Sequence, residues 1–114
     1  MAAYIITEKI TIRRQEGDYP ANIIIIVPVL INMDIFTEVK FNVYNDDETL
    51  LFSRTLSGGH ITVTDQTIDV TLEASNTLNK EGKYKWECEI SRTSEVITVG
   101  EGSFIIKNQL ISNI

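Results

Sequence analysis

Apolar and polar residues alternate along most of this chain with a period of two, the pattern of a half-buried β-strand. The clearest case is residues 84–90, whose lysine and glutamate side chains share one face. The opposite face carries Tyr84, Trp86, Cys88 and Ile90. Similar runs are separated by turn sequences such as NDDE, SGGH and SRTS. The pattern predicts strands at residues 5–12, 21–31, 39–44, 49–56, 61–64, 67–72, 84–90 and 95–107.

Helical periodicity is nearly absent. No stretch of ten residues or more has apolar side chains at i, i+3, i+4 and i+7, and residues 74–80 (ASNTLNK) are the one candidate for a helical turn. Parallel strands need a long crossover, usually a helix, so we expect antiparallel pairing. About seven strands predict an all-β fold, an immunoglobulin-like antiparallel β-sandwich without a long helix, in one domain over residues 1–114. A closed barrel is the alternative.

The segment ANIIIIVPVLIN, residues 21–32, departs from the alternation because both of its faces are apolar. Its run of nine aliphatic or proline residues covers about half the length of a membrane-spanning helix, and Pro28 favours an edge or bulged strand. The odd-numbered residues from 23 to 31 should fill the core. On the other face, Ile24, Ile26 and Leu30 need a second cover and are candidate interface residues. That cover is either the N-terminal segment or residues 74–80 of the same chain, or another subunit.

The sequence EGKYKWEC, residues 81–88, resembles the tyrosine corner of immunoglobulin-like domains. Gly82 precedes Tyr84, whose hydroxyl is expected to bond back to the preceding loop. Lys80 stands where those domains usually have aspartate, and Trp86 stands where they have a disulfide cysteine. Later in the chain, a Gly-Glu-Gly interrupts the last strand and predicts a β-bulge, with close backbone approach as the alternative. Its two glycines are Gly100 and Gly102.

Composition narrows the class of partner. Ten basic and sixteen acidic residues give a net charge of −6, which disfavours nucleic acid and anionic membranes. A hydrophobic content of 43% over 114 residues is enough for one core. The single cysteine, Cys88, has no partner for an internal disulfide, and the first fifteen residues carry no recognisable export signal. A reducing cytoplasm or a disulfide-free particle fits these features.

Candidate catalytic and ligand-binding groups are sparse. Cys88 and His60 are the one possible nucleophile and base, but Cys88 is predicted to be a core residue, where a thiol is unreactive. The acidic residues 46–48, with Asp34 or Asp65, have no calcium-loop spacing and are expected to form a solvated turn. We therefore predict that the chain has no catalytic, cofactor or metal site and is not an enzyme. Possible sugar-stacking aromatics are Tyr4, Tyr19 and Tyr44.

Four motifs occur in a characteristic order along the chain. They are Gly17-Asp18, Gly58-Gly59-His60-Ile61, the stretch from Asn76-Thr77-Leu78 through Gly82 and Trp86 to Ile90, and Thr98 through Gly102 to Phe104-Ile105-Ile106. This order resembles small β-sandwich domains of phage and prophage tail modules, including the N-terminal domain of baseplate upper proteins. Glu16 replaces the arginine often found before the Gly-Asp turn.

The resemblance implies a non-enzymatic virion structural or assembly protein of the tail or baseplate. Its partners would be further copies of itself or other phage structural proteins, without nucleic acid or membrane insertion. It would be located in the virion, or in the host cytoplasm before assembly. The alternative is a carbohydrate- or protein-binding adhesion module of a bacterial surface protein.

Overall fold

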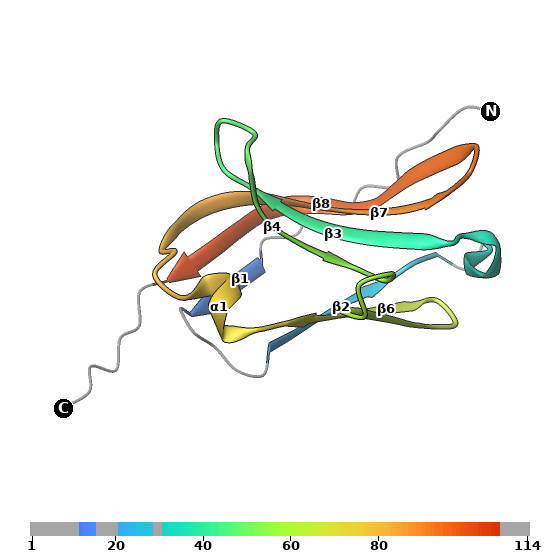
Figure 1. Ribbon diagram of the computed structural model, residues 1–114, viewed down its shortest axis with the longest axis horizontal. Helices are drawn as coiled ribbons and strands as arrows, with labels where there is room; N and C mark the ends of the chain where they lie inside the picture. The colour runs from blue at the N-terminus through green and yellow to red at the C-terminus, as the bar shows by residue number, and fades with distance from the viewer. Residues whose placement is uncertain (1–11, 16–20, 29–30, 108–114) are drawn as a thin grey trace.

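The structure, a computed structural model, describes residues 12–15, 21–28 and 31–107, which form two β-sheets packed face to face (Figure 1). The five-stranded sheet has the order β1-β8-β7-β3-β4, and the three-stranded sheet has the order β2-β6-β5. The strands are β1 (Ile12–Gln15), β2 (Ala21–Ile26), β3 (Glu38–Tyr44), β4 (Leu50–Thr55), β5 (Ile61–Thr64), β6 (Thr67–Leu72), β7 (Gly82–Arg92) and β8 (Glu95–Lys107). Two short helical turns complete the described residues: η1 (Met33–Ile35) and α1 (Ala74–Thr77).

The predicted all-β sandwich is confirmed, and its strand order is that of immunoglobulin-like domains. β2, β6 and β5 follow the B-E-D order, while β8, β7, β3 and β4 follow the order G-F-C-C′. The last strand was predicted at residues 95–107, and β8 has these bounds. The helical turn predicted within residues 74–80 is present as α1.

The N-terminal part of the prediction needs correction. Residues 13–15, expected to begin a charged turn, form most of β1, which pairs in parallel with β8. The other strand pairs are antiparallel, as expected. A parallel partner ninety residues away leaves no local signal in the sequence, because each strand was predicted from its own alternation. Residues 5–11 of the predicted first strand lie outside the described residues.

The strand predicted at residues 21–31 is also shorter than expected. β2 ends at Ile26, and the amide of Ile31 donates to the carbonyl of Pro28 at 3.0 Å, so the chain turns here. The 3₁₀ turn η1 follows, and its first residues are capped by the Asn32 side chain, which accepts from the amide of Asp34 at 3.1 Å. Pro28 is exposed just beyond a strand at the edge of its sheet, close to its predicted edge position.

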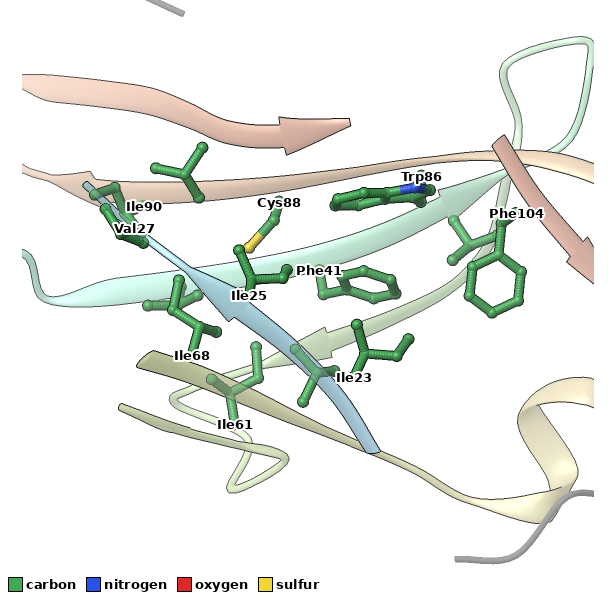
Figure 2. Close-up of a cluster of buried hydrophobic side chains, with 14 of the residues drawn as sticks. Ile23, Ile25, Val27, Phe41, Ile61, Ile68, Trp86, Cys88, Ile90 and Phe104 are labelled. Carbon is green, nitrogen blue, oxygen red and sulfur yellow. The ribbon is translucent and has the colours of Figure 1, made fainter. Parts of the chain in front are cut away.

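Aromatic side chains occupy the centre of the core, where immunoglobulin-type domains have a disulfide. Trp86 stacks on Phe41 with ring centroids 5.5 Å apart, and Figure 2 shows both rings between the two sheets. Phe104 makes edge contacts with Phe41 and with Phe52. From β2, Ile23 and other odd-numbered residues point into the same space (Figure 2). This packing replaces the covalent link between the sheets with apolar burial.

The predicted tyrosine corner is present at the start of β7. The hydroxyl of Tyr84 donates to the carbonyl of Lys80 at 2.7 Å. Gly82 leaves room for this contact, because a Cβ atom there would lie 3.3 Å from the Tyr84 hydroxyl oxygen. The lysine at position 80 does not disturb the corner, since its main chain accepts the bond.

A β-bulge is present next to the Gly-Glu-Gly interruption, and a close approach is found at its first glycine. Cys88 lies opposite Gly100 whereas Glu89 lies opposite Thr98, so Val99 is an extra residue on β8. The bulge thus precedes the glycines. Gly100 also permits a close approach, because a Cβ atom there would lie 2.8 Å from the Cη2 atom of Trp86. Gly102 lies opposite Trp86 on β8, and no separate role for it follows from the contacts.

Candidate functional site

Two isoleucines on β2 form an uncovered apolar surface. The side chains of Ile24 and Ile26 are 54% and 74% exposed on the outer face of the three-stranded sheet. The inner face of the same strand is buried, with Ile23, Ile25 and Val27 in the core. We call Ile24 and Ile26 the β2 patch. Contiguous exposed apolar side chains mark interaction sites more often than scattered ones, so the β2 patch is the main candidate for an interface.

The neighbours of the β2 patch on the outer face are polar. Ile24 lies opposite Asp69 and Ile26 lies opposite Thr67 on β6. The carboxylate of Asp69 accepts a hydrogen bond from Nδ2 of Asn22 at 2.8 Å. A polar rim around an apolar centre is the usual arrangement of a protein interface.

The main chain of the β2 patch faces the edge of the sheet. In an antiparallel pair, positions that bond to the partner strand alternate with positions whose amide and carbonyl point away. The amide of Val27 donates to the carbonyl of Gln66 at 2.8 Å, in register with the β2–β6 ladder. Ile25 therefore bonds to β6, and the main-chain groups of Ile24 and Ile26 point to the other side. Among the described strands, none lies beyond β2 on that side.

The end of this edge is held by Gln66, a residue that the sequence did not single out. Its Nε2 atom lies 2.8 Å from the carbonyl of Pro28, 3.0 Å from that of Ile31 and 3.3 Å from that of Val27. A glutamine after a short turn carries no recognisable signal, because its acceptors come from a different part of the chain. These bonds tie the loop after β2 to β6, which fixes the position of Ile26.

Two segments of the same chain were expected to cover the outer face of β2, residues 74–80 and the N-terminal segment. Residues 74–80 do not cover it: α1 follows the end of β6 at Leu72, which pairs with Ala21 at the far end of β2 from Ile26. The N-terminal segment falls in residues 1–11, outside the described residues, and so does the third candidate interface residue, Leu30. Because Ile24 and Ile26 are exposed, we treat their cover by another subunit as a proposal, developed below.

Cys88 and His60 do not form a catalytic pair. Burial raises the pKa of Cys88 to about 12, with smaller contributions from Glu89 and Glu87, so the thiol is protonated at neutral pH. Cys88 lies in the core between the sheets (Figure 2). His60 is half-buried before β5, and its Nδ1 atom is buried without a hydrogen-bond partner among the described residues.

The acidic residues 46–48 form the turn between β3 and β4. Asp47 accepts hydrogen bonds from the amide and hydroxyl of Thr49 at 3.1 and 2.6 Å, and these bonds lower the pKa of Asp47. In the described part of the chain, no group of three His, Cys, Asp or Glu side chains could hold a metal ion. An open hollow of about 590 Å³ lies beside this turn, lined by Asp46, Lys83 and Tyr84 among others.

The outer face of the five-stranded sheet carries a hydrogen-bonded polar network. Asn42 accepts a bond from the hydroxyl of Ser53 and donates from Nδ2 to the hydroxyl of Tyr44 at 3.2 Å. That hydroxyl donates to Glu87 at 3.1 Å. Burial, followed by the bond to Glu87, raises the pKa of Tyr44. Tyr44 is therefore engaged within its own sheet. Tyr4 and Tyr19, the other sugar-stacking candidates, lie outside the described residues.

Comparisons with known proteins add no family to these observations. No protein-family model matches the chain, and no curated protein matches it in sequence. None of the helices in the described residues has the length and apolar character needed to cross a membrane. The resemblance to phage tail domains therefore stays a prediction from the motifs named above.

Proposed function

We propose that this protein is a non-enzymatic structural or assembly domain of a phage or prophage virion, a tail or baseplate building block or adaptor. It acts by associating with other phage structural proteins or with further copies of itself. The observation that carries the proposal is the β2 patch: Ile24 and Ile26 are bare on a strand at the edge of the sheet. The order of the turn and core motifs supports the phage assignment.

The energetics of the β2 patch favour association. Fully burying an isoleucine side chain contributes roughly 1.5–3 kcal/mol. Since Ile24 and Ile26 are 54% and 74% exposed, a partner covering both would gain roughly 1–2 kcal/mol from each. A strand edge also offers unpaired amide and carbonyl groups to a partner.

The sequence of β2 lacks the usual protection against edge pairing. Proteins commonly blunt exposed edges with charged side chains, bulges or very short strands. β2 is six residues long, contains no charged residue and pairs with β6 without a register shift. Among the described residues this edge has none of these protections, which supports association with a partner.

Mass spectrometry of particles purified after prophage induction in the source organism tests the assignment. We expect the chain to be present in the particle in a reproducible ratio to the other tail proteins. The Ile24→Asp, Ile26→Asp double variant should be lost from the particle while it remains folded, with only a small fall in its thermal midpoint, because both side chains are exposed and the new carboxylate at position 24 lies opposite Asp69. Leu50→Asp is the matched control, since Leu50 is 53% exposed and also lies on an edge strand, β4.

Equal incorporation of the Ile24→Asp, Ile26→Asp variant and the wild-type chain would contradict association through the β2 patch. Absence of the wild-type chain from particles would limit the phage assignment to an assembly factor that leaves before completion.

The adhesion module is the second candidate, and the open hollow beside the β3–β4 turn favours it. Acidic, hydroxyl and amide groups around a half-buried tyrosine are groups that bind sugar hydroxyls. A glycan array with the wild-type chain and with Asp46→Ala tests this function. Binding that Asp46→Ala removes would support it, and no binding by the wild-type chain would exclude the carbohydrate form.

A further inference from the structure

We infer that β2 pairs antiparallel with β2 of a second copy across a two-fold axis at Ile25, with Ile24 of each copy opposite Ile26 of the other. This inference rests on the proposed function in one respect: it names the partner and the geometry of association at the β2 patch. The two three-stranded sheets would then join into one six-stranded sheet. The occupant of the β2 edge is thus a second copy of this chain.

The hydrogen bonds within the three-stranded sheet fix which main-chain groups are available. The amide of Thr71 donates to the carbonyl of His60 at 2.9 Å, so odd-numbered residues of β6 bond to β5. Even-numbered residues of β6 bond to β2, in agreement with the Val27 to Gln66 bond. Both observations place the amide and carbonyl of Ile24 and Ile26 at the outer edge of β2.

The register follows from these two residues. With the axis at Ile25, Ile24 and Ile26 of opposite copies occupy hydrogen-bonded positions, where each pair exchanges two main-chain bonds. Their side chains then lie on the same outer face, and four isoleucines form one cluster. Pro28 has no amide hydrogen, so the pairing ends before it. Centring the axis elsewhere would place a polar or proline residue opposite one of the two isoleucines.

Charge favours a copy of this chain over a charged partner at this edge. Residues 21–28 contain no charged side chain, so two copies meet there without like-charge contact. The nearest charged group on the outer face is Asp69, opposite Ile24 on β6, and its carboxylate is bonded by Asn22. The net charge of −6 still repels two copies at long range, so salt should strengthen the pairing by screening.

The area of contact predicts a weak dimer. A strand of six residues is about 20 Å long and presents an edge of limited width, far less than the roughly 800 Å² per partner of a stable interface. We therefore expect a dissociation constant on the order of 1 mM for isolated chains. Many copies held close together in a particle would pair at this affinity, because their effective concentration is in that range.

Amide hydrogen exchange by NMR on the full chain tests the pairing at about 20 µM and about 1 mM, a span chosen around that dissociation constant. The amides of Ile24 and Ile26 should exchange about twofold more slowly at the higher concentration, because about half of the chains are paired when the concentration equals the dissociation constant. The amide of Ile25 should be protected equally at both, because it bonds to β6. Fast exchange of Ile24 and Ile26 at both concentrations would overturn the inference, and so would equal protection at both.

A cysteine cross-linking experiment tests the register. An equimolar mixture of Ile24→Cys and Ile26→Cys chains should form disulfide dimers about threefold faster than either chain alone, because opposite positions are closer than diagonal ones. Buried Cys88 provides no background, and Leu50→Cys is the control of matched exposure. Faster cross-linking of Ile24→Cys with itself would overturn the register.

One variant separates main-chain pairing from apolar contact. Ile26→Pro removes an amide hydrogen that points away from β6, so the β2–β6 ladder stays while the pairing between copies is lost. Ile26→Val keeps that amide and should retain the concentration-dependent protection of Ile24. Equal protection of Ile24 in the two variants would overturn the strand-pairing geometry.

The failure of this inference and the failure of the proposed function give different results. If the Ile24→Asp, Ile26→Asp variant is lost from particles but no dimer forms at about 1 mM, the function stands and the partner is a different protein. If dimers form in solution but the chain never enters a particle, the pairing stands and the virion assignment fails.

Discussion

The outer faces of the two sheets differ in how far their side chains are shielded from water by other residues of the chain. On the five-stranded sheet, polar side chains bond to one another so closely that Asn42 is only 9% exposed, although it faces outward. On the three-stranded sheet, Ile24 and Ile26 stand bare on the edge strand β2. The polar network of the first face is satisfied within the chain, although Leu50 and Val96 of that sheet are exposed, whereas the β2 patch is stabilised further only when something covers it. An outer face becomes a candidate interface when its own residues leave its apolar groups uncovered.

The strongest contrast lies within β2 itself. Ile25→Asp should destabilise the fold by more than about 4 kcal/mol, because it places a carboxylate in the core. Ile26→Asp should change the free energy of unfolding by less than about 0.5 kcal/mol, since the side chain is 74% exposed. Urea denaturation of both variants measures the difference. Similar losses for the two would mean that the outer face of β2 is covered in the isolated chain.

The Arg54 side chain forms a hydrogen bond between the two sheets. It is buried on β4, and its Nε atom donates to the carbonyl of Thr71 at 3.0 Å while Nη2 donates to Glu73 at 3.1 Å. Arg54→Ala should lower the free energy of unfolding by about 2 kcal/mol, because the buried Thr71 bond and the packing of the arginine stem are lost. The ion pair with Glu73 contributes little to this loss, because the Glu73 side chain is exposed to solvent. Glu73→Gln, with an expected loss under about 0.5 kcal/mol, is the control.

The polar network on the outer face of the five-stranded sheet should have a measurable structural value. Asn42→Ala should cost about 1–2 kcal/mol in chemical denaturation, because Ser53 and Tyr44 each lose a partner. Ile24→Thr on the other sheet is the comparison and should cost less than about 0.5 kcal/mol. A cost at Ile24 as large as that at Asn42 would remove the distinction between the two faces.

The smallest expected effect concerns the acidic side chains beside this network. Burial raises the pKa of Glu89, and Glu87 raises it further, against a lowering by Lys40. The folded state therefore holds this proton more tightly than the unfolded state. The contribution of Glu89 to the free energy of unfolding is fully present below its pKa in the unfolded state. It is lost as the pH rises through its pKa in the folded state.

Replacement of Glu89 tests whether its charged form destabilises the folded state. At pH 7, Glu89→Gln should raise the thermal midpoint by about 1–2 °C, and the gain should disappear in acid, where wild-type Glu89 is protonated. Thermal unfolding followed by circular dichroism between pH 3 and pH 7 gives both values. A lower midpoint at pH 7 would show that Glu89 stabilises the fold in its charged form.

Much of the fold could be predicted because side-chain alternation is a local property. The buried faces of β3, β6 and β7 follow from their own residues, and the corner at Tyr84 could be predicted from the resemblance of residues 81–88 to a tyrosine corner. The role of Gln66 could not, because it depends on carbonyl groups more than thirty residues away. The 3₁₀ turn η1 was not predicted either, although its capping residue Asn32 directly precedes it, because the apolar run before it favoured a longer strand.

The sequence by itself determined that β2 has two apolar faces and that its odd-numbered residues enter the core. Only the tertiary structure decided that β2 lies at the edge of a three-stranded sheet, that β1 joins the other sheet in parallel, and that Ile24 and Ile26 are exposed. The physical reason is that alternation records which side chains prefer burial. Which strands become neighbours depends on pairing between distant segments, and that pairing decides whether a second apolar face is covered.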